Sequence, residues 1–489
     1  MFLQLDGDGA HYGQLIRAIR AAILSGRLSG GTKLPSSRTL ALEMGCSRTT
    51  VFAAYEDLRA EGYITGRPGS GSYVSTVAIK TLPNPLVGKR FVAPPSRFAM
   101  RARQQKEWPV PPRHPSLRFD LRCGSSQINP VLGAIWAREL TWAATHTATE
   151  LGSAWGLPAL REQICQHLAL RRGVQVTPDR VLVISGPQQA IALSAQILLN
   201  EGDTVVLEDP HCIDARQQFE VYGANTILIA TDSDGLVCRA LPTAPPRLVV
   251  VGPAHQFPSG ALMSLSRRIE LLNYAETKSC WILEFDNDSE LRCDSQPLAP
   301  LRSLDRTDMV IYTGTLSKLM FGPLQLGYMV LPEAMRDTFA IAKSLEDFSC
   351  SAIQQAALAH FMANGGFERH LRHVHRELHA RHREMIEGLH RHAGQRVEIA
   401  GTRVGMHLIV WLPRYDHSQL DTLIALANER GLGLYSIAPH YQERPASPGL
   451  LLGYGALSKT QLRDAMQLFG ECLDTIDATK QRRMKAAAG

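Results

Sequence analysis

A lysine preceded by hydroxyl side chains offers the most distinctive chemistry in this sequence. Thr315 and Ser317 come just before Lys318, in the stretch GTLSKLMFGPLQLGYMVLP. A lysine amine becomes nucleophilic when burial and nearby cations lower the pKa of its ammonium group, and it then condenses with an aldehyde to a Schiff base. The pattern indicates a Schiff-base lysine, and the alternative is an ordinary solvated surface charge.

A second stretch has the features of an anion-binding turn. In ISGPQQAIALSAQIL, from Ile184 to Leu198, a strand pattern passes through Gly186-Pro187 into a helical pattern. The free backbone N–H groups at a helix N-terminus attract anions. The candidate cradle consists of Ser185, Gly186, Gln188 and Gln189.

Four further side chains are candidates for contacts with a small molecule. His255 follows a strand pattern, and Arg216 offers a guanidinium group to an anion, although a surface role is the alternative for Arg216. His407 and His440, in the last part of the chain, are candidates for the same pocket.

A different chemistry is encoded near the N-terminus. Ser47 is a candidate N-cap for a helix that begins Arg48-Thr49-Thr50. Hydroxyls and free N–H groups there suit phosphate oxygens, and the fork of Arg48 suits a guanine edge in the major groove. The remaining candidate contacts to double-stranded DNA are Lys33, Ser36, Arg38, Tyr55, Gly69, Ser70 and Gly71, although the helical spacing of Tyr55 also fits the core.

The elements that position these DNA-contacting residues fill residues 1–76. Apolar spacing predicts a helix from Tyr12 to Leu24, a second from about Ser36 to Met44 and a third from Ser47 to about Glu61. Two short strand patterns joined by a glycine-rich turn follow Gly62. Three helices followed by such a hairpin indicate a winged helix-turn-helix.

The next segment, residues 77–118, is rich in proline and in basic residues. Proline forbids long helices, so we expect an extended, basic linker here. Its charge either contacts phosphates weakly or serves solubility alone.

From Phe119 onward, apolar strand patterns alternate with helical patterns. The runs VLVI, TVVLE, RLVVV, CWILEF and DMVIY predict a largely parallel α/β sheet with helices on both faces. We expect a large domain over residues 119–396 and a small α+β part with terminal helices over residues 397–489.

The bulk composition restricts the class of protein. With 489 residues, 45% hydrophobic and 20% charged, the chain is long enough for a small and a large globular domain. No apolar run reaches the length of a membrane span, and the start of the sequence lacks a signal-peptide pattern. The nine cysteines include no C-x-x-C pair, which argues against a disulfide framework. We expect a cytoplasmic protein, and the net charge of +6 permits nucleic-acid binding.

The segment from Leu28 to Val74, LSGGTKLPSSRTLALEMGCSRTTVFAAYEDLRAEGYITGRPGSGSYV, resembles the GntR family of regulators over both helices and the wing. The large domain resembles fold-type I aminotransferases that use pyridoxal phosphate (PLP), and the whole chain is similar to the MocR-type regulators that join the two. The resemblance implies operator DNA as a partner, a homodimer formed by the large domain, an amino-acid-like or pyridoxal-type effector, and an internal aldimine at Lys318.

Several positions depart from that family's cofactor site. Where the strand motif is typically Glu-Asp-Asp-Tyr-Asp-Ser-Glu, this chain has Glu284-Phe285-Asp286-Asn287-Asp288-Ser289-Glu290. Phe285 replaces the carboxylate that pairs with the pyridine nitrogen, Asn287 replaces a phenol, and Gln325 replaces a phosphate-binding arginine. His211-Cys212 likewise replaces Gly-Tyr after Asp209-Pro210.

These replacements weaken the case for catalysis. Without a carboxylate the pyridine ring is a poor electron sink, and the missing arginine removes a contact of about 1.5–3 kcal/mol. Asp286 is an unsuitable substitute, because a one-residue slip turns its side chain to the opposite face of the strand. Two interpretations stay open: either Lys318 holds PLP as a signal, or the pocket has changed its ligand.

The histidines between His370 and His392 lie at helical spacings that permit metal binding. Because arginines are dense there and no cysteine is near, we interpret the stretch as the polar face of a long helix and predict no metal site.

The primary hypothesis is a sequence-specific DNA-binding regulator that is not an enzyme, whose aminotransferase-like domain senses an effector. One alternative is a PLP aminotransferase with a vestigial DNA-binding head. The other is a constitutive DNA-binding dimer in which the large domain is a scaffold.

Overall fold

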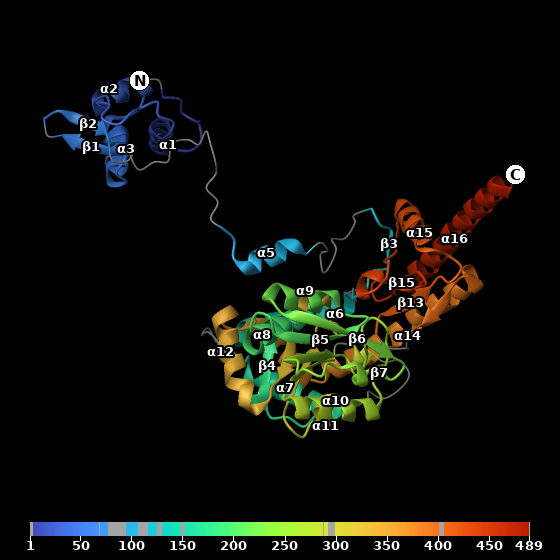
Figure 1. Cartoon of the computed structure of the whole chain (residues 1–489). Helices are drawn as coiled ribbons and strands as arrows, with labels where there is room; N and C mark the ends of the chain where they lie inside the picture. The colour runs from blue at the N-terminus through green and yellow to red at the C-terminus, as the bar shows by residue number, and fades with distance from the viewer. Residues whose placement is uncertain are drawn as a thin grey trace. The chain divides into compact units, whose positions relative to one another are not determined.

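A computed structural model describes residues 3–67, 69–76, 94–105, 116–124, 130–147, 152–286, 288–291, 299–400 and 405–488, with the backbone alone for residue 130 and residues 483–488. Asn287 therefore lies outside the described residues. The chain forms two compact units, Met1–Pro94 and Pro95–Gly489 (Figure 1).

The N-terminal unit is a three-helix domain with a β-hairpin wing. Its elements are α1 (His11–Leu24), α2 (Ser37–Met44), α3 (Arg48–Ala60), β1 (Ile64–Arg67) and β2 (Gly71–Val74). Ser36 and Ser47 cap α2 and α3, and Gly45 ends α2 in the left-handed conformation. The antiparallel pairing of Ile64 with Val74 sets the hairpin register. These elements confirm the predicted winged helix-turn-helix.

The second unit is built on an eight-stranded mixed sheet. Its order is β4-β11-β10-β9-β8-β5-β6-β7, and the strands β10, β9, β8, β5 and β6 are parallel neighbours. The sheet strands are β4 (Val181–Ile184), β5 (Thr204–Asp209), β6 (Asn225–Asp232), β7 (Gly235–Leu236), β8 (Leu248–Val251), β9 (Trp281–Asp286), β10 (Val310–Thr315) and β11 (Gly327–Val330).

Helices cover both faces of this sheet, as expected of buried parallel strands. Alternate residues of β4 show the period of two: Leu182 and Ile184 pack on one face with α8, and Val181 and Val183 pack on the other with α7. The covering helices are α6 (Pro130–His146), α7 (Pro158–Arg172), α8 (Pro187–Leu198), α9 (Ile213–Tyr222), α10 (Leu265–Lys278), α11 (Leu301–Leu304), α12 (Arg336–Asp347), α13 (Ala352–Ala363) and α14 (Gly366–His392).

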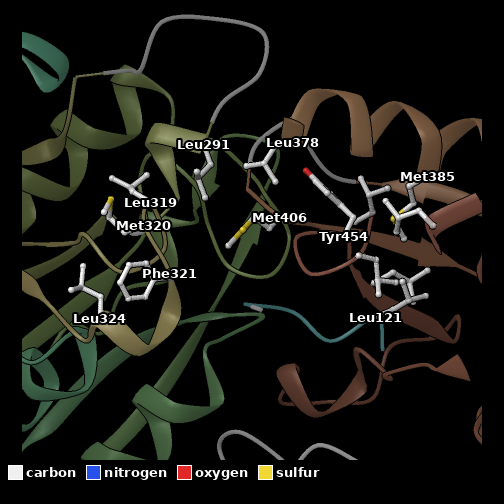
Figure 2. Close-up of a cluster of buried hydrophobic side chains, with 14 of the residues drawn as sticks. Leu121, Leu291, Leu319, Met320, Phe321, Leu324, Leu378, Met385, Met406 and Tyr454 are labelled. Carbon is white, nitrogen blue, oxygen red and sulfur yellow. The ribbon is translucent and has the colours of Figure 1, made fainter. Parts of the chain in front are cut away.

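The C-terminal part is a small α+β layer that shares its core with the large sheet domain. Figure 2 shows Met406 between Leu291 of the large part and Tyr454 of the small part, in one continuous hydrophobic cluster. The Tyr454 hydroxyl donates to the Gly405 carbonyl at 2.7 Å. The elements of this part are β12 (Glu398–Ala400), β13 (His407–Trp411), α15 (His417–Glu429), β14 (Leu432–Gly433), which pairs with β3 (Phe119–Asp120), β15 (Gly449–Gly453) and α16 (Lys459–Ala488).

The segment predicted to be an extended linker contains a short helix. Helix α5 (Arg97–Gln104) begins after Ser96, whose hydroxyl accepts from the Ala99 N–H at 3.2 Å. The expectation of an extended chain was wrong at residues 97–104, because this proline-free stretch has a good N-cap and packs against α9.

None of the helices in the described part of the chain is long and apolar enough to cross a membrane.

Candidate DNA-binding surface and effector site

The first turns of α2 and α3 present an exposed, capped surface. The Ser47 hydroxyl accepts from the Thr50 N–H at 3.1 Å and lies 2.7 Å from the hydroxyls of Thr49 and Thr50. Ser36 caps α2 in the same way through the Thr39 N–H. These caps fix the backbone while leaving Arg48 and Thr49 exposed.

The basic residues expected to contact DNA have no acidic partner in the described part of the N-terminal unit. Arg38 and Arg48 are exposed and form no ion pair there, and neither does Lys33. By contrast, Arg17 binds Asp6, Arg20 binds Glu61 and Arg59 binds Glu56. The wing tip is also exposed at Gly69, Ser70 and Gly71, where two glycines have positive φ.

Tyr55 does not belong to this surface. Its side chain is 4% exposed, and its hydroxyl donates to the Pro35 carbonyl at 3.0 Å. The burial corrects its inclusion among the DNA contacts and supports the alternative, a place in the core.

In the large unit, Lys318 lies in the wall of a cavity of about 710 Å³. Its Nζ donates to both carboxylate oxygens of Asp288 at 2.9 Å. Burial opposes ionisation of Asp288, but Lys318 and then His255 outweigh it and hold the pKa of this carboxyl well below its ordinary range. Lys318 thus forms an ion pair inside the cavity.

The register of β9 separates Phe285 from Asp286. Phe285 lines the cavity. Asp286 does not: its Oδ2 accepts from the Arg172 guanidinium at 2.9 Å and from the Tyr312 hydroxyl at 2.6 Å. The two side chains lie on opposite faces because adjacent strand residues alternate, so no carboxylate of β9 itself faces the cavity.

Most residues predicted for the cofactor site lie outside the cavity wall, and several of them form hydrogen bonds within the protein instead. The Ser317 hydroxyl bonds to the backbone of Leu326, Thr315 Oγ1 accepts from the Ser317 N–H, and the Gln189 amide bonds to Ser185 and Asp347. Of the predicted set Lys318, Thr315, Ser317, Ser185, Gly186, Gln188 and Gln189, only Lys318 and Gln188 line the cavity.

Gln325 lines the cavity where the family has an arginine. Its side-chain amide donates to the Gly322 carbonyl at 2.9 Å, and its backbone is left-handed at φ 48°. Gln188, at the start of α8, donates instead to Asp214 of α9 at 3.1 Å. An acidic side chain therefore binds at the turn that was predicted to hold an anion.

Three of the four effector candidates meet in the cavity. His255, His407 and His440 all line it, and the His255 and His407 rings lie 5.5 Å apart. Burial lowers the pKa of His407 to about 4, so its imidazole is neutral near pH 7. Arg216 is not in the wall, because its guanidinium binds Glu220 one turn along α9 at 2.7 Å.

Sequence reasoning missed three charged residues of the cavity wall. Arg122, just after β3, donates to the Tyr435 hydroxyl at 3.3 Å and lies 3.7 Å from Asp120. Burial raises the pKa of Glu208 to about 8 and that of Asp214 to about 6. The only signal was position: Glu208 ends a strand pattern, and Asp214 opens the following helix.

The histidine-rich helix is a structural element. The Nε2 atoms of His370 and His375 bond to the carbonyls of Leu319 and Glu290. Within the described residues, no group of three or more His, Cys, Asp or Glu side chains is arranged to hold a metal.

Helix α5 is held on the large unit by an aromatic contact with α9 and by charged contacts with Glu201, in the loop between α8 and β5. The Phe98 and Tyr222 rings meet edge to face at 5.3 Å, and Arg97 and Arg101 both bind Glu201, Arg97 at 2.9 Å. The other end of α9 lines the cavity with Ile213, Asp214 and Ala215. One helix therefore contacts both the cavity and the linker.

Comparison with known proteins agrees with this architecture. Residues 11–74 match the family model "Bacterial regulatory proteins, gntR family", and residues 123–444 match "Aminotransferase class I and II". The large unit has the fold of PLP-dependent aminotransferases. LysN, the α-aminoadipate aminotransferase of Thermus thermophilus, superposes with a TM-score of 0.70 at 23% identity, over 78% of this chain and 98% of that chain.

Full-length relatives join the same two parts. The chain is 32% identical to the probable rhizopine catabolism regulatory protein MocR of Rhizobium meliloti, over 95% of this chain and 94% of that protein. It is 28% identical to the pyridoxine biosynthesis regulator PdxR of Corynebacterium glutamicum, over 92% and 93%. The protein is a DNA-binding transcription regulator with an aminotransferase-like domain. It belongs to the MocR-type regulators of the GntR family.

Proposed function

We propose that this regulator binds a small-molecule effector in the cavity around Lys318, without PLP and without catalysing transamination. The observation that carries the proposal is the orientation of β9, which places Phe285 in the cavity wall and Asp286 on the opposite face. The cavity therefore lacks, on that strand, the acid that keeps a pyridine nitrogen protonated.

The remaining wall also fits PLP poorly. A phosphate group at the start of α8 meets the Asp214 carboxylate, and the Gln325 amide supplies no positive charge. The Lys318–Asp288 pair does not itself distinguish the two cases, since the family motif has an aspartate at the same position. The case rests on positions 285, 214 and 325.

The DNA-binding assignment follows from the exposed, unpaired basic residues. We propose that Arg48 contacts a base in the major groove, while Arg38, Lys33 and the capped helix starts at Ser36 and Ser47 bind phosphates. The wing tip at residues 69–71 is small enough to enter a minor groove or to lie along phosphates.

We propose that the active form is a homodimer joined through the large domain. Exposed apolar side chains support this: Leu345 is 84% exposed, Phe348 67% and Ile341 62%, all on or just after α12. A cluster of this kind marks a protein interface more often than a free surface.

Helix α9 provides a route from effector to DNA. Its ten residues span about 15 Å, from the cavity wall at Asp214 to the contact of Tyr222 with α5. An effector that prefers one position of α9 shifts the linker helix with it, as two-state coupling requires.

Operator affinity measured by fluorescence anisotropy tests the proposal, with a DNA fragment selected from random sequence. We expect at least one small molecule from a panel of amino acids and amines to change the affinity of the wild type. The same molecule should not affect a Lys318→Met/Asp288→Asn variant. PLP should change the operator affinity of neither the wild type nor the variant. Indifference to every compound would favour the scaffold alternative.

A further inference from the structure

The charged residues of the cavity wall do not balance one another. Among its described residues the cations are Arg122 and Lys318, and the acids are Glu208, Asp214 and Asp288. Both cations already have a carboxylate: Lys318 has Asp288 at 2.9 Å, and Arg122 has Asp120 at 3.7 Å. No cation of the described wall is left over for the other two acids, Glu208 and Asp214.

Of these two acids, Asp214 is the one that is ionised near pH 7, because burial raises the pKa of Glu208 to about 8 and that of Asp214 only to about 6. It accepts one hydrogen bond from the neutral amide of Gln188, and it forms no ion pair with any described residue. Burial raises its pKa to about 6, because hydrogen bonds, among them that from Gln188, and the charge of Lys318 offset burial only in part. A ligand with a positive charge would supply what this site lacks.

Two other wall residues have polar atoms without partners. Glu208 is 8% exposed and His211 is 3% exposed, and neither Glu208 Oε1 nor His211 Nδ1 has a hydrogen-bond partner among the described residues. A buried polar atom without a partner destabilises a protein unless a ligand or water satisfies it. His211 suits a ligand with N–H groups, because burial lowers its pKa to about 4 and leaves the imidazole neutral. Glu208, whose pKa burial raises to about 8, is mostly protonated near pH 7 and would ionise beside a positively charged ligand.

Much of the remaining wall is aromatic or aliphatic. Phe257, Phe285 and Tyr435 contribute ring surfaces, and Leu207 and Val250 contribute aliphatic ones. Ring faces attract ammonium groups through their quadrupole, and the aliphatic walls accept an apolar body. A phosphate or an unpaired carboxylate gains nothing from these surfaces and faces Asp214.

We propose that the effector is an organic monoamine, with its ammonium group on Asp214 and an aromatic or aliphatic body against Phe285. This inference rests on the proposed function, namely that the cavity binds an effector. It narrows the ligand to a compound whose positive charge is not cancelled by a carboxylate.

Three compounds that share a phenyl ring and differ in charge test the inference. They are phenethylamine, a cation, L-phenylalanine, a zwitterion, and 3-phenylpropionate, an anion. Isothermal titration of the full-length protein should show binding of phenethylamine and weaker or no binding of the other two. Asp214→Asn, which keeps the side-chain shape, should weaken phenethylamine binding by about tenfold or more. The control Asp421→Asn alters an acid on α15 that is 67% exposed, and it should change nothing.

Tighter binding of phenylalanine or phenylpropionate than of phenethylamine would overturn the inference, as would no binding of butylamine, phenethylamine or tryptamine. Should Asp214→Asn fold poorly by circular dichroism, Asp214→Glu serves instead, and it should bind within a few-fold of wild type. Measurements of operator affinity distinguish the proposed function, that the cavity binds an effector, from the further inference that this effector is an amine. An amine that binds without changing operator affinity defeats the proposed function alone, whereas an anionic ligand that changes operator affinity defeats the amine assignment alone.

Discussion

The side chains of Phe285 and Asp286 leave β9 on opposite faces of the sheet. Phe285 faces the cavity, whereas Asp286 binds Arg172 and Tyr312 in the core. The acid that the family uses for its cofactor has no counterpart in the wall at this position, and the adjacent acid is committed to structure. The replacement of the family's carboxylate by Phe285 is therefore the structural reason to expect a large domain that does not use PLP.

The ion pair between Lys318 and Asp288 should contribute to stability as a unit. Lys318→Met leaves the buried Asp288 carboxylate without its main partner and should cost about 3 kcal/mol of unfolding free energy. The double variant Lys318→Met/Asp288→Asn removes both charges and should recover most of that loss. Urea unfolding measures both. A double variant as unstable as the sum of the two single variants would contradict the coupling.

Arg48 should carry sequence preference. Arg48→Ala should weaken operator binding by about 1–3 kcal/mol and relax the preference at one base pair, because an arginine fork discriminates a guanine edge. Arg59→Ala is the matched control, since Arg59 is paired with Glu56. Fluorescence anisotropy with a set of single-base operator variants measures both the loss of affinity and the change in base preference. A uniform loss across all variants would instead assign Arg48 to the phosphate backbone.

Stability should fall at alkaline pH because of His167. Burial alone lowers the pKa of this imidazole, but the charges and hydrogen bonds of Glu290 and Glu368 outweigh burial and raise the pKa to about 9. A raised pKa gives stability that is complete below the ordinary value of 6.5 and is lost as the pH rises through about 9. Unfolding free energy should therefore drop by about 3 kcal/mol across that window, at about 1.4 kcal/mol for each pH unit between the two pKa values. The same drop in His167→Gln would exclude His167 as its source.

Helix α5 should be held less firmly when its aromatic contact with α9 is removed. Phe98→Ala removes an edge-to-face contact worth about 0.5–1.5 kcal/mol, so hydrogen-exchange protection of residues 97–104 should fall about two- to tenfold. In the control Arg103→Ala, a change on the same helix at a residue with no described partner, protection should stay the same. If α9 couples the cavity to the linker, Phe98→Ala should also reduce the effector's influence on operator affinity. An undiminished influence would place the coupling elsewhere.

Local patterns predicted the architecture well. The caps at Ser36 and Ser47, the terminator Gly45 and the alternating strand runs are local signals, and the structure has the corresponding elements. Counting back from Lys318 also predicted that position 285 faces the pocket, because strand alternation does not depend on distant contacts.

The composition of the cavity wall could not be predicted in the same way. Arg122, Asp214 and Tyr435 are far apart in the sequence and meet only through the tertiary fold. Arg216 was proposed for the pocket by residue type alone, but the helical i,i+4 spacing places Glu220 within its reach. The docked helix α5 was missed because the surrounding prolines dominated the interpretation of the segment.

The visible absorption spectrum during a PLP titration tests the central claim most directly. The wild-type protein should show no aldimine band that depends on Lys318, and its spectrum should match that of Lys318→Met/Asp288→Asn. A variant that restores the family's residues and removes the opposing carboxylate, Phe285→Asp/Asn287→Tyr/Gln325→Arg/Asp214→Asn, should gain such a band if it folds like the wild type. An aldimine band in the wild type that is absent from the double variant would contradict the account and make PLP the ligand of this cavity.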